Sequence, residues 1–297
     1  MQGRNFIDEL RFQLRSGTMT NRLIIVNVCV FLSLLLIRKG LLLFNMDPLM
    51  SDGWIHHFMD LNSSFSAFIR APWGLVTSIF THEEFGHLLF NMLFLYFSGR
   101  FFEQYFSRRK LWLTYLFGGI AGGLLELIAN NLFPALEGTN VVILGASGSI
   151  MAIFTALAFY QPNLQVSLFG IFPIRIYFLA LFFLFKDLIN IGTDDQIAHF
   201  AHLGGAIFGL LSIQNLHSPK NILNRLDGLI SRLTAVFKRE KKAKSTRARF
   251  KTDEEFNSEK RQKQVKMDQI LDKISKSGYD SLSKAEKDFL FHQSKNS

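Results

Sequence analysis

The sequence has one cysteine, Cys29, among its 297 residues, so an intrachain disulfide is excluded. It also has little charge, since Asp, Glu, Lys and Arg together make up 19% of the chain. Hydrophobic residues make up 48%, including 32 phenylalanines, which is too apolar for an ordinary soluble chain of this length. The composition therefore favours an integral membrane protein.

Net charge is absent from most of the chain. Residues 1–217 carry 13 basic and 13 acidic side chains, whereas residues 218–297 carry 20 basic and 11 acidic ones and supply the whole formal charge of +9. The sequence thus describes a neutral, apolar body with a basic polar tail. A cleavable signal peptide is not expected, because four arginines and a polar stretch precede the first apolar run and no small-residue cleavage site follows it.

Six apolar segments are candidates for membrane spans. They are residues 23–44, 84–102, 111–133, 141–159, 176–191 and 197–213. Short loops rich in Lys and Arg favour the cytoplasmic side, and such residues occur before the first span and after the second. We therefore predict an all-α, polytopic membrane protein with both termini in the cytoplasm.

The same pattern divides the chain into four parts. They are a cytoplasmic segment at 1–22, a membrane domain at 23–216, a basic linker at 217–263 and a small helical hairpin at 264–297. The linker begins with a basic stretch, residues 222–237, that could rest on anionic lipid as an amphipathic helix, whereas the charge run over 238–263 is expected to be solvated. In the hairpin, Ser283 and Glu286 have the spacing of a capping box before a second helix.

The fourth span carries Gly-Ala-Ser-Gly at residues 145–148. Glycines near Ser147 leave its hydroxyl unshielded, and at the start of a helix its own N–H is among the unsatisfied donors. Such a position suits a nucleophile with an oxyanion donor at hand. The alternative is that these small residues only allow another helix to pack closely.

Four histidines lie at the matching depth and favour the nucleophile. His82 and His87 are at the outer end of the second span, and His199 and His202 are at the outer end of the sixth. A serine nucleophile needs a base within hydrogen-bond reach. We predict His202 as this base rather than His199, because the glycine pair after His202 allows close approach to the serine helix.

Other polar residues in or near these spans are candidates for an oxyanion hole, a metal site or a helix contact. His87 and Asn91 share one helix face, so with the Ser147 N–H they could form an oxyanion hole. Zinc binding by His82 and His87 is not expected, because a five-residue separation turns two helical side chains about 140° apart. No other metal or cofactor is expected. Glu126, inside the third span, is either functional or hydrogen-bonded to a neighbouring helix, and the sequence leaves both open.

Three segments, in order, carry a family resemblance. HEEFGHLLFN (82–91), GASG (145–148) and AHLGG (201–205) resemble the HxxxxHxxxN, GxSG and AHxxG motifs of rhomboid intramembrane serine proteases. The resemblance covers about residues 70–210 and includes Gly99, Arg100 and Glu103, which are similar to the family's GRxxE.

The resemblance implies a six-transmembrane-helix, rhomboid-like bundle with a cytoplasmic helical tail. It also implies a dyad of Ser147 as nucleophile and His202 as general base, without a third, acidic member. His87, Asn91 and the Ser147 backbone would stabilise the oxyanion, with His82 beside them.

Two positions depart from the family pattern. Gly74 follows Trp73 where an arginine is common, and Met151 stands where a tyrosine often packs on the catalytic histidine. The expected function is a serine endopeptidase that cleaves single-pass transmembrane substrates near the extracytoplasmic side of a bacterial plasma membrane, in contact with lipid and without a nucleic-acid partner. The alternative is a catalytically silent relative that binds membrane clients. The natural substrate, the oligomeric state and the role of the tail are left open.

Overall fold

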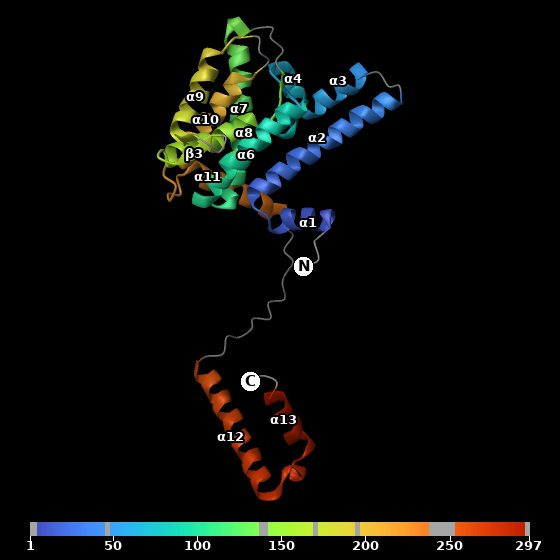
Figure 1. The fold of residues 1–297 in the computed structure, drawn as a ribbon, viewed down its shortest axis with the longest axis vertical. Coiled ribbons are helices and arrows are strands. Elements are labelled where there is room, and N and C mark those ends of the chain that lie inside the picture. The colour runs from blue at the N-terminus through green and yellow to red at the C-terminus, as the bar shows by residue number, and fades with distance from the viewer. Residues whose placement is uncertain are drawn as a thin grey trace. The chain divides into compact units, whose positions relative to one another are not determined.

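The computed structural model describes residues 5–44, 48–136, 142–168, 172–193, 197–237 and 253–294. The chain divides into two compact units, Met1–Ala235 and Val236–Ser297. The helices that begin in the first unit are α1 (Phe6–Ser16), α2 (Met19–Leu43), α3 (Pro48–Met59), α4 (Phe65–Arg70), α5 (Gly74–Thr77), α6 (Phe85–Tyr105), α7 (Arg108–Leu132), α8 (Ser147–Tyr160), α9 (Ile176–Ile189), α10 (His199–Ile213) and α11 (Ile222–Phe237). Figure 1 shows α6 to α10 gathered into one bundle.

Short elements occupy the connections. They are the 3₁₀ turns η1 (Ser78–Phe80) and η2 (Pro134–Leu136), and two antiparallel strand pairs, β1 (Leu61–Asn62) with β2 (Val142–Ile143) and β3 (Gln165–Leu168) with β4 (Phe172–Arg175). The small helices α3, α4 and α5 lie between the first and second predicted spans, and the β3–β4 hairpin lies between the fourth and fifth.

The predicted all-α class is confirmed, because a helix occupies each of the six predicted spans. These helices are α2, α6, α7, α8, α9 and α10. Among the described residues, α2 and α7 are long and apolar enough to cross a membrane by length and composition, and α8 and α10 are shorter apolar helices. The number of crossings stays a prediction.

The most buried helix is α8, in which every residue from Gly148 to Ala158 is buried. A side-chain carbon added at Gly205 of α10 would collide with the backbone of Gly148, and one at Gly209 would collide with the backbone of Ala152. The predicted glycine face of the sixth span therefore meets α8 backbone to backbone. In an apolar solvent this close packing supplies much of the attraction between helices.

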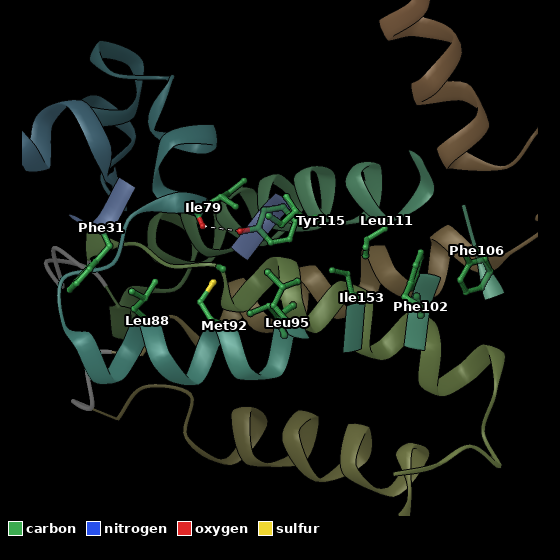
Figure 2. Close-up of a cluster of buried hydrophobic side chains, with 14 residues drawn as sticks. Phe31, Ile79, Leu88, Met92, Leu95, Phe102, Phe106, Leu111, Tyr115 and Ile153 are labelled. Atoms are coloured by element: carbon green, nitrogen blue, oxygen red, sulfur yellow. Dashed lines mark hydrogen bonds between the residues drawn. The ribbon is translucent and has the colours of Figure 1, made fainter. Parts of the chain in front are cut away.

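Apolar side chains on another side of α8 join it to α2, α6 and α7, as Figure 2 shows. Leu95 and Ile153 are fully buried in this cluster, and Tyr115 lies beside them with no exposed surface. The Tyr115 hydroxyl accepts a hydrogen bond from the Asn27 side chain at 2.9 Å. The buried phenol is therefore paired, and the pair ties α2 to α7.

The Gly99 and Glu103 positions of α6 hold the first turn of α2. A side-chain carbon at Gly99 would collide with Thr20. Glu103 accepts hydrogen bonds from the Met19 N–H at 2.8 Å, the Thr20 N–H at 3.1 Å and the Thr20 hydroxyl at 2.6 Å. The carboxylate thus caps the N-terminus of α2, where the helix has free N–H groups and favours negative charge.

The helix α11 lies in the segment predicted as a basic linker over 217–263, after the predicted end of the membrane domain at residue 216, and it packs on the bundle. Leu223 is only 2% exposed because it packs in a cluster with Leu113 and Phe208. The Asn221 amide also donates to two carbonyl oxygens, one in the last turn of α10 and one just after that helix. The amphipathic face of α11 therefore covers the first unit rather than lipid alone.

The second unit contains α12 (Asp253–Ser277), η3 (Tyr279–Ser281) and α13 (Lys284–Ser294). It is the predicted hairpin, although α12 begins at Asp253 rather than at residue 264. The capping box is formed: the Ser283 N–H donates to Glu286 Oε2 at 2.7 Å, and the Glu286 N–H donates to Ser283 Oγ at 3.4 Å. Residues 238–252, which hold much of the predicted charge run, lie outside the described residues.

We predict that Gly205→Ala lowers the melting temperature of the purified protein, because its new methyl group meets backbone that cannot rotate away. Overpacking of this kind costs about 1–3 kcal/mol. The matched control is Gly40→Ala in α2, where an added carbon meets nothing within 4 Å. That change should stabilise by about 0.5–1 kcal/mol through helix propensity. Equal melting temperatures for the two variants would contradict the backbone contact.

A pH prediction follows from the capping box. Hydrogen bonds from the Ser283 N–H and hydroxyl, with Lys273 nearby, lower the pKa of Glu286 from 4.5 to about 2. Since the folded pKa is the lower one, the cap stabilises α13 fully above pH 4.5, and this contribution is lost as the pH falls through about 2. Carbon NMR of the Glu286 carboxyl should give this midpoint, and Ser283→Ala should raise it part of the way to 4.5. A wild-type midpoint near 4.5 would show that the cap does not form.

Candidate active site

Ser147 is the first residue of α8 and follows a turn that only glycine readily adopts. Gly145 has a φ of +105°, and its N–H donates to the carbonyl oxygen of Ser78 at 2.8 Å. This bond fixes the approach to α8 from the η1 turn. At the first helical position the Ser147 N–H has no carbonyl partner within the helix, so it remains available to a ligand.

His202 comes from the first turns of α10 and reaches the serine directly. Its Nε2 lies 2.8 Å from Ser147 Oγ. The approach depends on the glycine contact between the two helices, because Gly205 lies one turn further along α10 and presses on Gly148. The structure brings Ser147 together with His202, whereas His199 faces another partner.

That partner is Asp187 of α9, which the sequence reading did not include in the site. Asp187 Oδ1 lies 2.9 Å from His199 Nδ1 and 3.0 Å from His202 Nδ1, and its Oδ2 lies 3.1 Å from His202 Nδ1. The side chains of Asp187 and His199 are only 4% and 3% exposed. The resemblance implied a dyad without an acidic member, yet here a buried carboxylate contacts the histidine of that dyad.

The predicted oxyanion residues of α6 lie beside the turn that precedes Ser147. A side-chain carbon at Gly145 would come within 3 Å of the His87 ring and 3.7 Å of Asn91 Nδ2. Asn91 Nδ2 donates to the His87 carbonyl oxygen at 3.0 Å. An amide nitrogen has two hydrogens, so a second one is left for a ligand. His87, Asn91 and the start of α8 therefore face the same small region.

His82 lies just outside α6, which begins at Phe85. The separation of about 140° expected for His82 and His87 on one helix therefore does not apply. The rings of His82 and His87 pack edge to face with centroids 5.1 Å apart. Burial, with His87 alongside, lowers the pKa of His82 to about 4, so its ring is neutral at neutral pH. Its Nε2 accepts a long hydrogen bond of 3.4 Å from the Ala146 N–H. His82 thus supports the backbone just before the serine.

Glu126 of α7 is hydrogen-bonded to a neighbouring helix, which is one of the two alternatives that the sequence left open. Its Oε2 accepts from the Ala201 N–H at 3.0 Å, and its Oε1 accepts from the Asn130 amide at 2.7 Å. The carboxyl group is therefore a second acceptor for the Ala201 N–H, which also donates to the Ala198 carbonyl oxygen at 3.0 Å. It holds the segment of α10 that carries His202.

Two groups of histidine and carboxylate side chains in the described part of the chain are close enough to share a metal ion. They are Asp187 with His199 and His202, and His56 with Asp60 and Glu83. In the second group, His56 Nδ1 bonds Asp60 Oδ2 at 2.5 Å, and Arg38 lies 3.5 Å from Glu83. Burial raises the pKa of Asp60 to about 6, against the opposing effect of His56. Hydrogen bonds and ion pairs between their own members account for both groups without an ion.

The family model for the Rhomboid domain matches residues 70–218, about half of the chain. The chain belongs to the rhomboid family. It is therefore an integral membrane protein of the class that includes intramembrane proteases. All the residues around Ser147 described above fall within the matched region.

Several curated rhomboid proteins are similar over this region. RHOMBOID-like protein 12, mitochondrial, of Arabidopsis thaliana is 32% identical over 143 residues, 44% of this chain and 43% of that protein. Rhomboid protein 1, mitochondrial, of Saccharomyces cerevisiae is 28% identical over 152 residues, 48% of this chain and 42% of that protein. YdcA of Bacillus subtilis is 25% identical over 142 residues, 48% of this chain and 68% of that protein.

The chain spans less than half the length of the two mitochondrial relatives. Because relatives of mitochondria, chloroplasts and a bacterium all match, they do not support the predicted assignment to a bacterial plasma membrane. Residues 251–296 of this rhomboid match a second model, that of a family of unknown function (DUF6576). The hairpin is therefore a recurring module.

We predict that Glu126→Ala destabilises the protein, because it removes the hydrogen bonds that the buried carboxyl group accepts from the Ala201 N–H and the Asn130 amide. Hydrogen bonds to a charged group contribute about 1.5–3 kcal/mol each, and those to a neutral group about 0.5–1.5 kcal/mol. Glu126→Gln keeps an acceptor oxygen and should melt close to wild type. Thermal melts of both variants in detergent test this role. A stable but inactive Gln variant would instead show that the carboxyl group itself is functional.

Proposed function

We propose that this chain is an intramembrane serine endopeptidase that cleaves single-pass, transmembrane-anchored proteins. The observation that carries the proposal is the distance of 2.8 Å between Ser147 Oγ and His202 Nε2. A base at this distance can take the hydroxyl proton as the oxygen attacks, which activates an otherwise weak nucleophile.

In the first half of the reaction, Ser147 Oγ bonds to the carbonyl carbon of the scissile peptide, and its proton passes to His202 Nε2. The carbonyl oxygen becomes an oxyanion. The Ser147 N–H, Asn91 and His87 are the donors for it, and His82 supports the backbone beside them. Each well-placed donor of this kind lowers the barrier by about 2.7–4 kcal/mol in a soluble protease.

In the second half, the carbon–nitrogen bond breaks, and His202 returns its proton to the leaving amine. Water then adds to the acyl group on Ser147 while His202 takes a proton from it. As the ester bond breaks, His202 returns that proton to Ser147 Oγ, and the product leaves with a new carboxyl terminus. Every proton transfer passes through His202 Nε2, and the covalent bond forms at Ser147 Oγ. These two side chains therefore supply the base, the acid and the nucleophile that the reaction needs.

The placement of the residues supports cleavage near one membrane surface. His87, Ser147 and His202 all lie in the first two turns of their helices, α6, α8 and α10. These helices correspond to the second, fourth and sixth predicted spans, which enter the bilayer from the same side. By the positive-inside rule that side is extracytoplasmic, and both chain termini lie opposite.

We predict that Ser147→Ala abolishes cleavage of a fluorescent transmembrane substrate and labelling by a fluorophosphonate probe. Loss of the serine costs about 10⁶-fold in kcat in a soluble serine protease. Ser149→Ala is the matched control, because Ser149 is buried in the same helix and its hydroxyl has no hydrogen-bond partner. It should keep both turnover and labelling.

The comparison of these two serines also separates the two functions considered for the chain. Equal turnover by wild type and Ser147→Ala would contradict the protease. Wild-type protein that retains a membrane client, and is neither labelled nor active, would favour a catalytically silent binder.

A further inference from the structure

We propose that Asp187 is a positioning residue for His202, so that Ser147, His202 and Asp187 form a triad rather than a dyad. The inference rests on the proposed function and assigns a role within the same site. Asp187 lies on α9, a helix for which the sequence analysis predicted no site residue.

The first argument is the tautomer of the histidine. To accept the serine proton, His202 needs a lone pair on Nε2, so in the neutral ring the hydrogen must be on Nδ1. Asp187 supplies an acceptor for that hydrogen, with its two oxygens 3.0 and 3.1 Å from His202 Nδ1. A carboxylate cannot donate in return, so it selects the tautomer that leaves Nε2 free to act as a base.

The second argument is the fixed position of the carboxylate. His199 Nδ1 lies 2.9 Å from the same Asp187 Oδ1, and both side chains are almost completely buried. His199 therefore clamps the carboxylate from the turn before His202. Two histidines three residues apart on α10 share one acceptor on α9, which joins the two helices directly at the site.

The third argument is that the usual neighbour of the histidine is missing. Met151, which stands where a tyrosine often packs on the catalytic histidine, is buried and carries no hydrogen-bond donor. Asp187 can orient the ring from the opposite nitrogen. It can also stabilise the positive charge that His202 gains during attack, which matters more in an apolar surrounding than in water.

The test compares Asp187→Asn with Asp187→Glu in the full-length protein. Asparagine has nearly the same shape, but its amide nitrogen can donate to Nδ1 and so favours the wrong tautomer. We expect Asp187→Asn to lower kcat by about 10²–10⁴-fold with KM changed less than threefold, since the equivalent change costs about 10⁴-fold in a soluble protease. Asp187→Glu should recover part of this loss. Lys186→Gln is the control on the same turn and should leave kcat unchanged.

A pH profile separates positioning from a merely structural role. Titratable side chains around His202 come from four helices: His87 of α6, Glu126 of α7, Asp187 of α9 and His199 of α10. Removing the negative charge disfavours the imidazolium form of His202. The acidic midpoint of the kcat/KM profile should therefore move to lower pH in Asp187→Asn. The same midpoint should move less in Glu126→Gln.

Should Asp187→Asn fail to fold, nitrogen NMR of histidine-labelled wild-type protein still decides the matter. The proposal expects neutral His202 to carry its hydrogen on Nδ1, and a ring protonated mainly on Nε2 would overturn it. Wild-type kcat and an unshifted pH profile in a folded Asp187→Asn protein would also overturn it. Those results would leave the proposed function intact, because that function is tested separately, by labelling and turnover of the wild type and of Ser147→Ala.

Discussion

The backbone contact between α8 and α10 is the constraint on which the rest of the site depends. Gly205 meets Gly148 and Gly209 meets Ala152 so closely that no side-chain carbon fits between them. This approach brings the first turns of the two helices together, and it sets the 2.8 Å separation of Ser147 Oγ and His202 Nε2. A larger residue at either glycine would separate the pair before it altered the chemistry of either side chain.

The glycine contact alone does not fix the rotation of α10, and buried carboxyl groups on its neighbours add that restraint. Glu126 of α7 accepts from the Ala201 N–H, and Asp187 of α9 contacts His199 and His202. Ala201 and His202 are adjacent, so the histidine is held from its backbone side and from its ring at once. Two helices that do not contain the serine therefore determine where its base points.

The sequence was sufficient for what its local patterns specify. Glycines spaced by four residues predicted the close face of the sixth span, and the spacing of His87 and Asn91 predicted their common face. Ser283 and Glu286 likewise formed the predicted cap. Asp187 was missed because it follows Lys186 directly, and two adjacent opposite charges suggest a pair that neutralises itself. In a helix, adjacent side chains point about 100° apart, so Lys186 and Asp187 face different surroundings. A buried acid on an apolar helix was the available signal.

The remaining errors share one physical origin, namely that tertiary contacts decide where a local pattern ends. His82 and His87 pack ring to ring because α6 starts between them, and α11 covers the first unit because Leu223 finds an apolar surface on α7 and α10. An amphipathic stretch carries the same sequence signature whether its apolar face meets lipid or protein. The polar groups distinguish the two cases: Asn221 donates to carbonyl oxygens in the last turn of α10 and just after it, and Arg109 of α7 pairs with Asp227 of α11 at 2.6 Å. These specific polar pairs fix which face of α11 meets the protein. A lipid surface offers no such partner for an individual side chain.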